Sequence, residues 1–111
     1  MTAPVRQRIE HAEAKMLQAD FADREGRAIL LAEAKDALLT AEHAAPGAGA
    51  WLLACIASAQ EQENLCRKWL DRAKKLGTLP PRTKLLEHHY LEAVRERKWF
   101  RALVAAAPAP E

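Results

Sequence analysis

The chain has 111 residues, of which 50% are hydrophobic, and its 17 Lys and Arg against 15 Asp and Glu give a formal net charge of +2. This length supports one domain and not two. Much of the hydrophobic content is alanine while valine and isoleucine are scarce, which favours helices over strands. No apolar run reaches the roughly 18 residues of a membrane span, and charges near the N-terminus argue against a secretion signal, so we expect a cytoplasmic protein without a membrane segment.

The apolar spacing predicts two helices in the first half of the chain. The first covers about 4–23, with Thr2 as its cap, and the second covers about 27–44. The sequence Asp23-Arg24-Glu25-Gly26 is predicted to be the break between them. Pro46 and the two glycines that follow it end the second helix.

The second half is predicted to contain four further helices. They cover about 48–59, 62–76, 82–95 and 98–106. The helix over 48–59 is apolar almost all round, which is typical of a helix packed between others. Residues 107–111 are rich in alanine and proline and are predicted to form a flexible tail.

Charge is distributed unevenly along these elements. Residues 1–66 carry six Lys or Arg against ten Asp or Glu, whereas residues 67–101 carry eleven against four. A basic segment of this kind can attract an acidic partner or a nucleic acid, and it can equally be the solvated face of a helix.

One spaced pattern occurs twice, 32 residues apart: Ala34, Leu38 and Ala41 recur as Cys66, Leu70 and Ala73. Each set places small, large and small residues on one helix face and is followed by a proline. On these residues, the segment Ala34–Pro46 resembles the second helix of a tetratricopeptide repeat. The segment Ala50–Pro80 resembles a nearly whole repeat that opens with Trp51-Leu52-Leu53-Ala54-Cys55.

This resemblance implies an all-α fold of five to six helices, in which antiparallel helical hairpins stack as a short right-handed array. The segments Tyr90–Arg95 and Trp99–Leu103 are similar to a capping tail seen after the last repeat of some bacterial members of the family. We therefore expect a single domain over 1–106, with a repeat core at about 27–80 and capping helices at about 82–106.

The chain also departs from the repeat pattern. Gln60–Gln62 stands where a glycine is usual between the two helices of a repeat. Two repeats are fewer than the three or so that an independent array needs. The terminal helices must therefore act as caps, or the chain must associate with a second copy.

The resemblance implies a non-catalytic scaffold or adaptor that binds a protein or peptide in an apolar concave groove. The groove would be lined by Ala48, Trp51, Leu52, Cys55 and Ser58. Basic residues beside it would steer an acidic partner: Arg67, Lys68 and Lys75. The alternative is a homodimer whose second subunit fills the groove.

Neither cofactor nor metal is expected. Cys55 and Cys66 are not in a CxxC motif, and the repeat pattern explains Cys66 as a small core residue. His88 and His89 would point about 100° apart on a helix and could not chelate one ion together.

The sequence contains no recognisable catalytic motif, and we expect no enzyme activity. Glu61 and Glu63 lie two residues apart in a turn, where they are predicted to face differently. Aromatic residues among the basic residues of 67–101 could stack on nucleic-acid bases. Because they fall on the apolar stripes, we assign them to the core and favour a protein partner over a nucleic acid.

Overall fold

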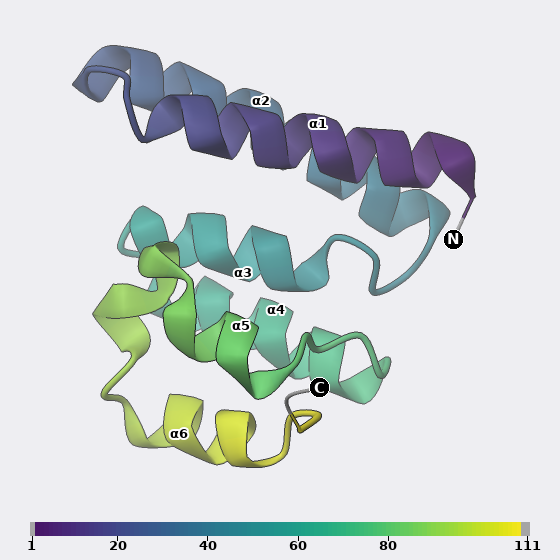
Figure 1. The fold of residues 1–111 in the computed structure, drawn as a ribbon, viewed down its shortest axis with the longest axis vertical. Helices are drawn as coiled ribbons and strands as arrows, with labels where there is room; N and C mark the ends of the chain where they lie inside the picture. Colours follow the sequence, from purple (N-terminus) through teal and green to yellow (C-terminus); the bar gives the residue numbers. More distant parts are fainter. Residues whose placement is uncertain (1, 110–111) are drawn as a thin grey trace. The chain divides into compact units, whose positions relative to one another are not determined.

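The computed structural model describes residues 2–109, which contain six α-helices, one 3₁₀ helix and no strand (Figure 1). The helices are α1 (Ala3–Ala19), α2 (Arg24–Ala44), α3 (Ala50–Ala59), α4 (Glu63–Lys75), α5 (Arg82–Glu87), the 3₁₀ helix η1 (His89–Val94) and α6 (Lys98–Ala105). The all-α fold class is confirmed. Every helix in this part of the chain is too short or too polar to cross a lipid bilayer.

The chain divides into two compact units, and the division falls between Gly49 and Ala50. We call the part up to Gly49 the N-terminal unit and the part from Ala50 the C-terminal unit. The expected repeat core at 27–80 lies across this division, so the single domain over 1–106 stays a prediction.

The N-terminal unit is an antiparallel pair formed by α1 and α2 (Figure 1). The Thr2 hydroxyl caps α1 by accepting a 3.4 Å hydrogen bond from the Val5 N–H. The Asp23 carboxylate caps α2 by accepting a 2.7 Å bond from the Gly26 N–H. Because of this cap α2 begins at Arg24, and the prediction of a break through Gly26 was wrong.

The core of this unit follows the apolar stripes of its two helices. Its buried residues are Val5, Ala12, Met16 and Ala19 from α1 and Leu31, Ala34, Leu38 and Ala41 from α2. Half of them are alanine, which allows the two helix backbones to approach closely.

The C-terminal unit is built around α3, which packs against α4 and η1, while α6 contacts α4 and α5. All of α3 is buried except Trp51 and Ala59, which are half-buried, as its apolar sequence predicts. Each later element contributes to the core: Cys66, Leu70 and Ala73 from α4, Leu85 from α5, Tyr90, Leu91 and Val94 from η1, and Phe100, Leu103 and Val104 from α6.

The helix predicted over 82–95 is broken at His88. The backbone of His88 is extended (φ −69°, ψ 116°), and its Nδ1 accepts a 3.2 Å hydrogen bond from the Tyr90 N–H. In one continuous helix Leu85 and Leu91 would point about 120° apart. Both are fully buried, and the break allows their two segments to turn separately toward the core.

Part of the predicted tail 107–111 is attached to α5. The N–H of Arg82 donates a 3.0 Å hydrogen bond to the Pro108 carbonyl oxygen. The Arg82 guanidinium donates to the carbonyl oxygens of Ala107 (3.2 Å) and Ala105 (3.1 Å). Ala107 is itself buried, so the ordered chain extends beyond α6. Residues 110–111 lie outside the described part.

Candidate functional site

The residues predicted to line an apolar groove lie mainly on α3. Leu52, Cys55 and Ser58 are buried rather than presented to solvent. Trp51 is half-buried, and its ring meets that of His88 edge-on with 5.5 Å between centroids. Ala48, also half-buried, lies in the loop that ends the N-terminal unit. These residues therefore do not form an open apolar surface in the structure.

The basic residues predicted to flank the groove are exposed on α4. The guanidinium of Arg67 lies over the ring of Trp99, 5.7 Å from its centroid. Lys68 and Lys75 form no ion pair with any described residue. Because they are seven residues apart, their side chains leave the same face of α4 about 10 Å from one another.

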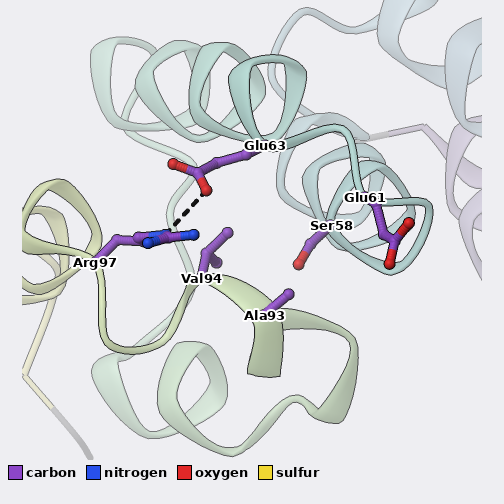
Figure 2. Close-up of a pocket in the computed structure, with 6 residues that line it drawn as sticks. All are labelled: Ser58, Glu61, Glu63, Ala93, Val94 and Arg97. Atoms are coloured by element: carbon purple, nitrogen blue, oxygen red, sulfur yellow. Dashed lines mark hydrogen bonds and ion pairs between the residues drawn. The ribbon is translucent and has the colours of Figure 1, made fainter.

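A cavity of about 240 Å³ opens in the C-terminal unit beside the end of α3 (Figure 2). It is lined by Ser58, Glu61, Glu63, Ala93, Val94 and Arg97. Ser58 is the one residue of the predicted site that lines it. Glu61 and Glu63 both line this cavity, and Figure 2 shows their carboxylates pointing in different directions, that of Glu63 toward Arg97.

The backbone at the end of α3 places Glu61 on the cavity. Glu61 has the left-handed conformation (φ 61°). Its N–H donates to the Ser58 carbonyl oxygen at 3.0 Å, and the N–H of Gln62 donates to that of Ala57 at 2.8 Å. These two bonds form a Schellman motif, in which glycine usually takes the left-handed position. The glycine missing from the sequence is thus replaced by a residue with a charged side chain.

The second carboxylate, that of Glu63, is held by two donors, one from the N-cap residue of α6 and one from its first turn. Arg97 Nε lies 2.9 Å from Glu63 Oε1, and Trp99 Nε1 lies 3.1 Å from Oε2. Because Glu63 stands in the first turn of α4, the helix dipole also favours its negative charge. The ion pair connects α4 with the start of α6, and the guanidinium charge of Arg97 compensates the carboxylate charge of Glu63.

The hydroxyl of Ser58 differs from these groups because it has no hydrogen-bond partner among the described residues. The residue is 2% exposed. Figure 2 shows its side chain pointing toward Ala93, another residue that lines the cavity. A buried hydroxyl without a partner is unfavourable, so this group is available to a molecule that enters the cavity.

The two cysteines are free thiols in the core. Burial raises the pKa of Cys55 well above its ordinary value, with a smaller contribution from Cys66. Burial, followed by the nearby Glu63, raises the pKa of Cys66 to about 12. Both thiols therefore stay protonated at neutral pH, where a thiolate is needed to attack a substrate or bind a metal.

Within residues 2–109, no three His, Cys, Asp or Glu side chains are grouped so that they could hold a metal ion. The rings of His88 and His89 do not diverge as on a helix. They are stacked, with centroids 5.3 Å apart and 4° between their planes, because the chain breaks between α5 and η1.

Sequence reasoning missed most of the cavity. Ala93 and Val94 come from the helix predicted over 82–95, Arg97 comes from the gap between that helix and the next, and no periodic pattern connects them with Glu61. The available signal was the absence of glycine from the turn after α3, which left a carboxylate in a position that favours glycine.

Comparison with known proteins gives no further identification: no family model, curated protein or solved structure matches the chain.

Proposed function

We propose that the chain is a non-catalytic protein-interaction module that binds an acidic peptide or protein through the exposed basic face of α4. The observation that carries this proposal is the pair Lys68 and Lys75, two exposed ammonium groups on one helix face without a carboxylate partner among the described residues. From Ala50 onward the sequence has eleven Lys or Arg against seven Asp or Glu, so the surroundings also favour an acidic ligand.

The proposal includes a tetratricopeptide-like arrangement of the helices. Two observations support it. Two helix pairs pack together, α1 with α2 and α3 with α4. The repeated sets Ala34, Leu38, Ala41 and Cys66, Leu70, Ala73 are fully buried on the second helix of each pair. A repeat of this kind uses small residues where its two helices approach.

Charge reversal on α4 tests the proposal. The probe is a fluorescent glutamate-rich peptide, and its affinity is measured by anisotropy over a series of salt concentrations. For the Lys68→Glu/Lys75→Glu variant we expect about tenfold weaker binding, because two exposed ion pairs together contribute on the order of 1.4 kcal/mol.

The matched control is Arg6→Glu/Arg8→Glu, which makes the same change of net charge on exposed positions of α1. It should bind the peptide as tightly as the unmodified protein. Equal weakening by both variants would indicate a response to overall charge and would contradict a site on α4. Tighter binding of a DNA duplex than of the peptide at equal salt would favour a nucleic-acid ligand instead.

A second candidate function, self-assembly, is favoured by exposed apolar residues in the N-terminal unit. Phe21 is 86% exposed and Leu17 62%; Leu17 lies in the last turn of α1 and Phe21 in the turn that follows it. Covering exposed apolar side chains with a second copy of the chain removes them from water, which stabilises the dimer. Light scattering should then give a dimer mass that Phe21→Ser returns to the monomer mass, and a monomer mass for the unmodified protein would exclude this candidate.

A further inference from the structure

The cavity in the C-terminal unit contains a buried polar group that the chain leaves unsatisfied. The Ser58 hydroxyl is one of two buried side-chain polar groups in the described residues without a hydrogen-bond partner, the other being Nε of Arg95. A hydroxyl can accept as well as donate a hydrogen bond. Since Ser58 lines the cavity, a molecule inside the cavity is the available source of its partner.

The carboxylate of Glu61 is a second polar group without a partner among the described residues. It forms no hydrogen bond or ion pair with any described residue, and Glu61 is one of the residues that line the same cavity. Its residue also keeps a left-handed backbone that a side chain with a Cβ adopts at a cost. Such strained conformations cluster at binding sites, and here the residue with this backbone lines the cavity together with Ser58.

The other charges of the cavity cancel. Arg97 and Glu63 form an ion pair, and the indole N–H of Trp99 satisfies the remaining Glu63 oxygen. Two carboxylates against one guanidinium leave the cavity with one uncompensated negative charge, that of Glu61. The remaining lining residues, Ala93 and Val94, provide an apolar wall.

We propose that this cavity binds a protonated primary amine at the end of a short aliphatic chain. The ammonium group has three donors. One would bond to the Ser58 hydroxyl oxygen and another to the Glu61 carboxylate, while the aliphatic chain packs against Ala93 and Val94. This site does not depend on the basic face of α4, because it uses different residues and takes a ligand of opposite charge.

The test is an NMR titration of the protein with n-butylammonium chloride, with sodium butyrate and n-butanol as comparison ligands at constant ionic strength. We expect n-butylammonium to shift the backbone amide signals of Ser58, Glu61, Ala93 and Val94, and butanol to bind more weakly because it lacks the charge. Butyrate binding as tightly as n-butylammonium, or no localised shift at any amine concentration at which the protein stays folded, would overturn the proposal.

Variants separate the two proposed contacts. Glu61→Gln removes the charge and keeps the shape, and we expect it to weaken amine binding about fivefold, the size of one exposed ion pair. Ser58→Ala should weaken it by a similar factor, about that of one hydrogen bond. The control Glu87→Gln makes the same charge change at an exposed position outside the cavity and should have no effect. A Glu61→Gln variant that binds the amine like Glu87→Gln would overturn the proposal.

The stability of unliganded Ser58→Ala gives an independent check. Because the hydroxyl has no partner in the free protein, this variant should be at least as stable as the unmodified protein. A clear loss of stability would mean that the hydroxyl is already satisfied, and would overturn the proposal.

A short lysine peptide, compared with its Nε-acetylated form, then identifies the source of the amine. Binding of the unmodified peptide alone indicates a lysine side chain of a partner protein. Binding of n-butylammonium but of neither peptide indicates a free amine.

Discussion

The buried carboxylate of Glu42 accepts a 2.6 Å hydrogen bond from the backbone N–H of Gly47, five residues further along the chain. Its other oxygen accepts a 2.9 Å bond from the N–H of Gly49. A carboxylate can be buried at low cost when its charge is met by such donors. This side chain therefore holds the loop after α2 against the end of that helix.

The first prediction concerns this loop. Glu42→Gln should lower the free energy of unfolding by about 1–3 kcal/mol, because the amide replaces one acceptor oxygen with a donor that faces a backbone N–H. The measurement is chemical denaturation followed by circular dichroism. Glu13→Gln, at an exposed position on α1, is the control and should change stability little. A Glu42→Gln variant as stable as this control would show that neither the charge nor the second acceptor oxygen of Glu42 contributes net stability.

The second prediction compares the ends of α3 and α4, which share one geometry. The N–H of Thr78 donates to the Ala73 carbonyl oxygen at 2.8 Å, the same bond that Gln62 makes to Ala57. Gly77 (φ 73°) therefore corresponds to Glu61. We expect Glu61→Gly to raise the free energy of unfolding by about 0.5–1 kcal/mol and Gly77→Ala to lower it by a similar amount.

Thermal melts of the two variants check this comparison. A Cβ at Gly77 would meet no atom within 4 Å, so any loss in Gly77→Ala comes from the backbone conformation and not from a clash. If neither variant changes the melting temperature, the left-handed residues carry no measurable strain.

The third prediction is a loss of stability at alkaline pH caused by Cys66. The pKa of its thiol rises from an ordinary value of 9.0 to about 12 in the folded protein. Between these values the unfolded chain releases a proton that the folded chain keeps, so stability is retained below pH 9 and falls as the pH rises above it. The expected slope is about 1 kcal/mol per pH unit.

Denaturation at about pH 8 and about pH 10 measures this slope. The quantity to compare is the change between the two pH values in the unmodified protein and in Cys66→Ala, since groups that do not interact with Cys66 titrate equally in both. The variant should lose less stability on going to the higher pH. Identical losses would show that Cys66 ionises as readily in the folded chain as in the unfolded one.

Much of the core could be predicted from the sequence, and most of the cavity could not. Leu38 and Leu70 are fully buried where the repeated pattern placed them, because helical spacing determines which side chains share a face. The break at His88 and the continuation of α2 through Gly26 depend on single hydrogen bonds that a backbone N–H donates to a side chain. Such bonds cannot be predicted from the spacing of apolar residues along the chain. The position of Glu61 on the cavity likewise depends on one backbone angle.

The hydrogen bonds from Arg82 to Ala105, Ala107 and Pro108 have a consequence for the order of folding during synthesis. They close a loop of the chain without a covalent link, and their acceptors are the last described residues of that loop to be made. The segment from α5 to α6 can therefore complete its structure only after Pro108 has left the ribosome, whereas α1 and α2 can pair much earlier. A ribosome paused before that residue would hold a nascent chain whose first helical pair has formed while Arg82 still lacks its three carbonyl acceptors.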